Sequence, residues 1–169
     1  MGALRVMVRM GDAGDPPAPA ALPQPSAILP HRAPALFLSR VTSCEEEGAT
    51  GAGVFPESLE LLSGHFPGRP MIPGVLLFEL AAQLVAYWAI SRYGGEYVLL
   101  TGLDRARLRA PVGAGEELTL QASIERVRAP LVRAKVVLSR GDQRVGEVVV
   151  SGYLEHQRST ARERAGAGR

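Results

Sequence analysis

One apolar run dominates the chain, from Val75 to Ile90, and only Glu79 and Gln83 interrupt it. A proline precedes the run and Gly94-Gly95 follow it, which are typical start and stop signals of a helix. The pattern predicts a helix over residues 75–92 that is apolar on nearly every face and must therefore be buried. The run falls short of the ~20 residues that a bilayer span needs, so we expect a core helix and no membrane span.

Beyond this helix the hydrophobic period becomes that of strands. Leu118, Leu120, Ala122 and Ile124 alternate with polar residues, which is typical of a half-buried strand. Further strands are predicted at 36–42, 51–55, 97–103, 106–110, 131–138 and 145–154, and a brief helix at 56–62. One long core helix with several antiparallel strands predicts an α+β architecture.

The 169 residues, 46% of them hydrophobic, suffice for one core but hardly for two domains. Residues 1–27 are rich in Pro, Ala and Gly, and residues 156–169 are polar and Arg-rich, so we expect two tails without a packed core. The folded domain is expected to span residues 28–155. The first residues lack the continuous apolar region of a signal peptide, which favours a cytoplasmic protein.

Charge and cysteine content exclude several classes of function. The net charge is only +2, and Lys135 is the only lysine among 19 basic residues, so we expect no nucleic-acid partner. The single cysteine, Cys44, excludes an intrachain disulfide and a Cys-based zinc site. Its acidic neighbours, residues 45–47, should raise the thiol pKa and disfavour a reactive thiolate. The three histidines are dispersed without metal-ligand spacing, so no metal site is expected.

Glu79 and Gln83 are the polar exceptions on the core helix, and their spacing of four residues places them on one face. In one interpretation Glu79 forms an ion pair or hydrogen bond that stabilises the core, helped by the nearby positive end of the helix dipole. In the other, a carboxyl group among apolar walls serves as a general acid.

His65 lies in the segment GHFPGRPMIPG, residues 64–74, which precedes the helix. Three prolines and three glycines make this segment a shaped loop rather than a helix or strand. A histidine in a loop is often a surface or hydrogen-bonded residue, and it is also a candidate base. His31 and His156 have weaker claims to a catalytic role.

Loop and helix together resemble a known family. The sequence GHFPGRPMIPGVLLFELAAQ, from Gly64 to Gln83, resembles the signature of FabZ-type 3-hydroxyacyl-(acyl-carrier-protein) dehydratases. The segments LPHRAPALFLSRV, residues 29–41, and GLDRARLRAPVGAGEEL, residues 102–118, are similar to that family in the same order and spacing. The resemblance covers nearly all of residues 28–155 and neither tail.

The resemblance implies a hot-dog fold, in which an antiparallel sheet wraps around one long helix and two subunits join their sheets. It implies a homodimer in which His65 and Glu79 of opposite subunits form each site, and the dimers commonly assemble into hexamers. His65 would then be the base that takes the C2 proton, and Glu79 the acid that protonates the leaving hydroxyl. The Gly74 N–H would bind the thioester oxygen and Gln83 would orient Glu79, with no metal or cofactor.

The family's substrate is carried by an acidic acyl carrier protein. Arg105, Arg107 and Arg109 alternate so that they share one strand face, which suits docking of such a partner as well as it suits a solvated surface. Arg126, Arg128 and Arg133 could extend this basic surface. Several apolar residues of the helix could line an acyl tunnel, although most are expected in the core: Leu76, Phe78, Leu80, Leu84 and Tyr87.

Other members of the fold remain as alternatives. A FabA-type dehydratase and isomerase has Asp where this chain has Glu79, and hot-dog thioesterases generally lack the GHFPG loop. A non-catalytic, carrier-binding subunit of a heteromeric dehydratase is a third alternative, which the presence of both His65 and Glu79 disfavours. Ala33 stands where the family often has an aromatic residue. The pathway is expected to be fatty-acid synthesis or a related polyketide or polyene route.

Overall fold

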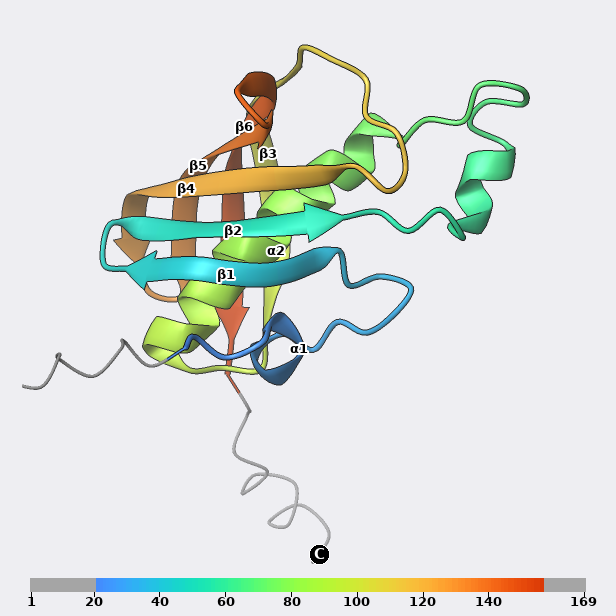
Figure 1. Ribbon diagram of the computed structural model, residues 1–169. Helices are drawn as coiled ribbons and strands as arrows, with labels where there is room; N and C mark the ends of the chain where they lie inside the picture. The colour runs from blue at the N-terminus through green and yellow to red at the C-terminus, as the bar shows by residue number, and fades with distance from the viewer. Residues whose placement is uncertain (1–20, 157–169) are drawn as a thin grey trace, which may run out of the picture.

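The computed structural model describes residues 21–156, which form a six-stranded sheet curved around one long helix (Figure 1). The strand order is β1-β2-β4-β5-β6-β3, and every neighbouring pair is antiparallel. The elements in chain order are α1 (Pro25–Ile28), β1 (Leu38–Glu45), β2 (Gly48–Val54), the 3-10 helix η1 (Glu60–Ser63), α2 (Gly74–Tyr93), β3 (Tyr97–Leu108), β4 (Glu117–Arg128), β5 (Leu131–Arg140) and β6 (Gln143–Glu155). This is the predicted α+β architecture.

Helix α2 is the core of the fold. It begins after Pro73 and ends at Gly94, whose φ of 71° terminates the helix in a conformation that glycine adopts readily. Among the described residues, α2 is the one helix that is long and apolar enough to cross a membrane. It has 20 residues, so the sequence estimate of its length was too short. However, 56% of its most apolar stretch is buried inside the protein. The sheet of the protein itself therefore buries this apolar helix.

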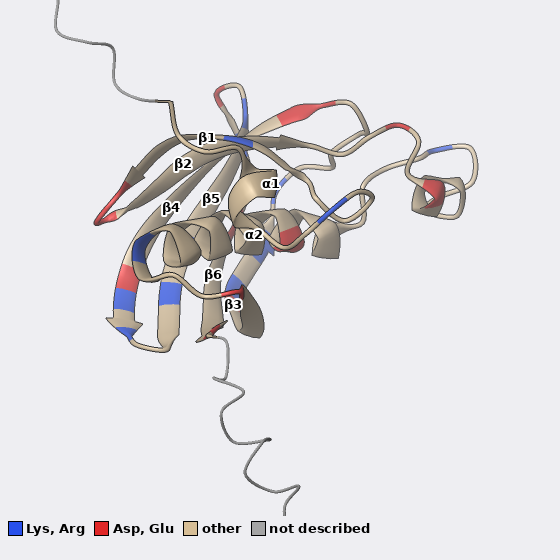
Figure 2. Ribbon diagram, turned by 90° about the horizontal axis from the view of Figure 1, so that it is seen from below, with Lys and Arg blue, Asp and Glu red and all other residues tan. Residues whose placement is uncertain are grey.

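The sheet covers α2 with alternate side chains of its strands. In β4, Leu118, Leu120 and Ala122 are buried while their neighbours are exposed, as the period of two predicts. The side chains of Leu80, Leu84 and Tyr87 on α2 are fully buried, so these residues belong to the core. Figure 2 shows that charged residues lie mainly on the sheet and its loops, whereas α2 carries few.

The N-terminal boundary differs from the sequence prediction. Residues 21–27 were assigned to a tail, yet Pro25 is buried and α1 packs on α2. The Tyr87 hydroxyl donates a hydrogen bond to the Pro23 carbonyl at 2.8 Å, which holds this segment against the helix. Residues 1–20 and 157–169, where the two tails are expected, lie outside the described residues.

Two local predictions were also inexact. The predicted helix at 56–62 is the shorter η1, and the two strands predicted at 97–103 and 106–110 are the single strand β3. Register shifts between Leu100 and Gly102 and between Asp104 and Arg107 interrupt the alternation of β3 without ending its pairing with β6.

Strand β3 forms one edge of the sheet and exposes large apolar side chains. Leu99, Leu100 and Leu103 are each at least two-fifths exposed, and Tyr97 and Leu108 lie on the same strand with comparable exposure. An unpaired edge with this composition is a surface on which another strand can pair.

Replacement of a buried leucine tests the role of α2. Leu84→Ala should lower the free energy of unfolding by about 2–5 kcal/mol, because it leaves a cavity at a fully buried position. Leu61→Ala is the matched control, since Leu61 is 51% exposed, and it should change stability by less than about 0.5 kcal/mol. Urea unfolding monitored by circular dichroism measures both. Equal effects of the two substitutions would contradict this description of the core.

Candidate active site

His65 lies in the loop between η1 and α2, and backbone hydrogen bonds fix this loop. The Met71 N–H donates to the His65 carbonyl at 2.9 Å, and the Ile72 N–H donates to the Val112 carbonyl at 2.8 Å. The His65 ring places Nδ1 3.0 Å from the Met71 carbonyl. A carbonyl only accepts, so Nδ1 carries the proton in this hydrogen bond and the neutral ring keeps an unprotonated Nε2. That nitrogen has the form required of a base.

A cavity of about 330 Å³ brings the His65 ring together with the first turn of α2. Gly74 and Leu77 line it from the helix, and Leu108 and Arg109 line it from the end of β3 and beyond. A Cβ atom at Gly74 would collide with the end of the Leu108 side chain, so a larger residue at this position would have to displace that leucine. The first N–H groups of a helix have no partner within it, so the Gly74 N–H can serve an oxyanion beside His65.

Glu79 lines a second cavity, of about 150 Å³, with Gln83, Ala82 and Ala86 of α2. Its far wall is apolar and comes from β3 and β6: Val98, Leu99, Leu100, Val150 and Gly152. The Glu79 side chain is 36% exposed, so it is less enclosed in one chain than the surrounding apolar sequence suggested. This cavity provides the space beside the carboxyl group. The apolar helix residues considered for an acyl tunnel do not line it.

Gln83 is buried and uses both ends of its amide. Its Oε1 accepts hydrogen bonds from the N–H groups of Phe37 and Leu38 at 3.0 and 3.1 Å. Its Nε2 donates to the Ala35 carbonyl at 2.8 Å and to Glu79 Oε1 at 2.9 Å. Gln83 therefore joins the Glu79 carboxyl group to the segment that leads into β1.

His65 and Glu79 do not meet within one chain. They line different cavities, and Glu79 lies five residues beyond Gly74 on α2, which is about 140° around the helix axis. Within one chain, His65 and Glu79 therefore do not line a common cavity.

His31 is a residue that the sequence analysis placed low and the structure places beside Glu79. Its Nε2 lies 3.5 Å from Glu79 Oε1, and its ring lines the Glu79 cavity. The two residues are far apart in sequence, so no local periodicity predicts this contact. The only sequence signal was the position of His31 in the LPHRAP segment.

The predicted basic residues form two groups on the sheet. Arg105 and Arg107 line one depression with Lys135 and Glu147, and Arg109, just beyond the end of β3, donates to Glu147 at 2.9 Å. The hydrogen bond from Arg109, with the charges of the neighbouring basic residues, lowers the pKa of Glu147. Because Arg109 also lines the His65 cavity, this group extends to the candidate site.

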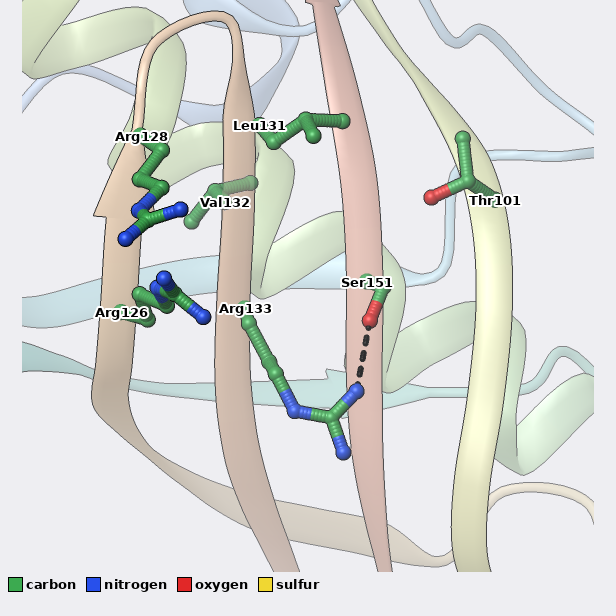
Figure 3. Close-up of a pocket in the computed structure, with 7 residues that line it drawn as sticks. All are labelled: Thr101, Arg126, Arg128, Leu131, Val132, Arg133 and Ser151. Carbon is green, nitrogen blue, oxygen red and sulfur yellow. Dashed lines mark hydrogen bonds between the residues drawn. The ribbon is translucent and has the colours of Figure 1, made fainter.

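The second group surrounds a cavity of about 300 Å³ (Figure 3). Arg126 and Arg128 come from β4, and Arg133 from β5 donates a hydrogen bond to Ser151 at 3.0 Å. Arg133 also forms ion pairs with Asp104 and Glu125. Part of the positive charge of this group is thus neutralised locally.

The thiol of Cys44 follows the sequence expectation in part. The pKa of the Cys44 thiol is raised, but the main cause is burial, with the acidic neighbour Glu45 a smaller cause and Arg92 opposing both. Within residues 21–156, no three His, Cys, Asp or Glu residues are grouped in a way that would hold a metal ion.

The sequence of this chain matches a known family of proteins. The family described as the FabA-like domain matches residues 29–149, so the chain belongs to the FabA-like family. Within that family it is similar to the 3-hydroxyacyl-[acyl-carrier-protein] dehydratases FabZ. The protein of that name from Thermoanaerobacter sp. (strain X514) is 37% identical over 119 residues, which cover 69% of this chain and 84% of the relative. The one from Chloroflexus aggregans is 35% identical over 120 residues, which cover 69% and 83%.

A solved structure supports the fold independently. The dehydratase heterocomplex ApeI:P from Xenorhabdus doucetiae superimposes with a TM-score of 0.69 at 17% identity, covering 80% of this chain and 93% of that one. The resemblance to FabZ-type dehydratases and the hot-dog fold expected from the sequence are thereby confirmed.

The buried amide of Gln83 gives a test of how the site is held. Gln83→Leu keeps the approximate volume but leaves the Phe37 and Leu38 N–H groups without their acceptor, at a cost of about 1–3 kcal/mol each. Gln121→Leu, at an exposed position of β4, is the matched control and should change stability by less than about 0.5 kcal/mol. Urea unfolding compares them, and an unaltered Gln83→Leu protein would refute the role given to the amide.

Proposed function

We propose that this protein removes water reversibly from (3R)-3-hydroxyacyl thioesters carried on acyl carrier protein, giving trans-2-enoyl thioesters. The reaction class, dehydration by a hydro-lyase, follows from its family and its FabZ relatives. One observation carries the proposal to the residues of this chain: the His65 ring, held by its Nδ1 contact with the Met71 carbonyl, shares a cavity with the N-terminus of α2 at Gly74.

Each step needs one of the named groups. His65 Nε2 takes the proton from C2, and the Gly74 N–H donates a hydrogen bond to the thioester oxygen as negative charge develops there. The C3–O bond then breaks, and a protonated Glu79 gives its proton to the departing hydroxide, which leaves as water. His65 has gained one proton and Glu79 has lost one, so a proton passing from the imidazolium to the carboxylate through solvent restores the enzyme.

We further propose that each site forms between two copies of the chain. His65 and Glu79 line separate cavities of one chain, whereas the reaction needs both at one substrate. The exposed apolar edge at β3 supports antiparallel pairing with β3 of a second copy, which would continue the sheet across a homodimer. Such dimers would then assemble further as a trimer of dimers.

Complementation between two inactive variants tests this arrangement. His65→Ala and Glu79→Gln homodimers should each lose at least about a hundredfold in rate, because each lacks the base or the acid. A heterodimer of the two, produced with two affinity tags and purified on both, contains one site with an intact His65 and an intact Glu79. It should regain about half of the wild-type rate per dimer.

The product of this assay also separates the alternatives. Mass spectrometry of the carrier protein should show loss of water from the acyl chain, whereas a thioesterase would release the acid. A heterodimer as inactive as its parents would contradict the shared site, and full activity in both homodimers would refute His65 and Glu79 as the acid and base.

The proposed carrier-docking surface is the basic group Arg105, Arg107 and Arg109. Its support is the position of Arg109, which belongs both to this group and to the wall of the His65 cavity. A carrier docked there would deliver its arm beside His65. The second basic group, around Arg133, would extend the surface. We propose that the protein acts in the cytoplasm, in fatty-acid synthesis or a related polyketide or polyene route.

Charge removal at this surface should affect carried substrates selectively. In the double variant Arg105→Ala, Arg107→Ala, which spares Arg109 of the His65 cavity, KM for a 3-hydroxyacyl thioester on carrier protein should rise several-fold, because the attraction to an acidic partner is lost. KM for the same acyl group on N-acetylcysteamine should stay unchanged. Replacing Arg126, Arg128 and Arg133 with alanine is the comparison at the other basic group. Equal effects on both substrates would contradict docking at Arg105–Arg109.

A second candidate role is that of a subunit in a heteromeric dehydratase. The observation that favours it is the fold similarity to the dehydratase heterocomplex from Xenorhabdus doucetiae. Purified alone, such a subunit would bind carrier protein without dehydrating its acyl chain. Turnover by the isolated homodimer would exclude this role.

A further inference from the structure

His31 and Gln83 contact the same oxygen of Glu79. Gln83 Nε2 donates to Glu79 Oε1 at 2.9 Å, and His31 Nε2 lies 3.5 Å from that atom. Both contacts come from groups that are themselves held in place, and both address Oε1 rather than Oε2. The two carboxyl oxygens of Glu79 therefore have different surroundings.

The burial of the other ring nitrogen indicates which tautomer of His31 is present. Nδ1 of His31 is buried and has no hydrogen-bond partner among the described residues. A proton on Nδ1 would leave a buried donor unsatisfied, whereas a bare nitrogen there leaves only an acceptor without a partner. The neutral ring then carries its proton on Nε2, which faces the Glu79 oxygen.

The segment that carries His31 is held on both sides of the ring. Arg32 donates to the carbonyl groups of Leu29 and His31 at 2.8 and 2.7 Å, which closes the turn, and Leu29 is buried. A few residues further on, Ala35 is tied to Gln83. His31 therefore approaches Glu79 from the segment leading into β1, and a hydrogen bond ties this segment to Gln83 on α2.

We propose that His31 is a positioning residue for Glu79, which makes Oε2 the oxygen that carries and donates the proton. With the Gln83 hydrogen bond on Oε1 and His31 Nε2 lying 3.5 Å from the same oxygen, a proton on Oε1 is disfavoured relative to one on Oε2. The contact of 3.5 Å is long for a hydrogen bond, and hydrogen bonds of catalytic groups commonly tighten when substrate is bound. This inference rests on the proposed function of Glu79 as the acid.

Substitutions of His31 that keep or remove the Nε2 donor test the proposal. The amide nitrogen of glutamine can stand in for Nε2, whereas asparagine is too short and leucine has no donor. His31→Asn and His31→Leu should lower kcat by about tenfold to a hundredfold with little change in KM, and His31→Gln should retain most of the wild-type kcat. His156→Gln and His156→Leu, at an exposed histidine, are the matched controls and should behave as wild type.

Two further measurements separate positioning from stability and from the proposed function itself. Thermal unfolding should rank the variants differently from kcat, because a purely structural role would make activity follow stability. Long-range ¹H–¹⁵N spectra of the wild type, assigned with His31→Leu, should show the Nε2–H tautomer of His31.

Three results would overturn the proposal. They are a loss of kcat in His31→Gln equal to that in His31→Leu, an unchanged kcat in all three variants, and an Nδ1–H tautomer of His31. A wild-type protein without dehydratase activity would instead refute the proposed function. The tautomer alone would then show whether His31 presents an N–H group to Glu79.

Discussion

The fold depends on enclosing a helix that is apolar almost all round. A flat sheet would cover only one face of α2 and leave other apolar faces in water, so the strands curl around the helix, as Figure 1 shows. The few polar groups on this helix therefore need hydrogen-bond partners or access to a cavity. Gln83 is accommodated because four hydrogen bonds satisfy its buried amide, and Glu79 because it faces a cavity at the edge of the enclosed volume.

The sequence predicted those parts of the structure that local patterns determine. The apolar run and the Gly94 stop placed α2 closely, and the alternation at Leu118–Ile124 placed β4. The same polar exceptions singled out Glu79 and Gln83, and the hydrogen bond between them is present. The expected roles of His65, Glu79 and Gly74 in the reaction stay predictions, which the complementation experiment addresses.

What the sequence missed depends on contacts between distant residues. The α1 segment has the composition of a flexible tail, and its order comes from Tyr87, more than sixty residues away. The proposed role of His31 depends on a contact with Glu79, which lies 48 residues later in the chain. Strand β3 was divided in two because register shifts near Gly102 and Arg105 disrupt the alternation on which the prediction rested.

The hydrogen bond between Tyr87 and Pro23 also bears on where the domain begins. Family similarity starts at residue 29, but the Tyr87 side chain is fully buried and its hydroxyl uses the Pro23 carbonyl as acceptor. A chain trimmed to the region of similarity would uncover this part of α2 and strip a phenol of its acceptor, which costs free energy. The residues that complete the packing of α2 therefore begin before the region of family similarity.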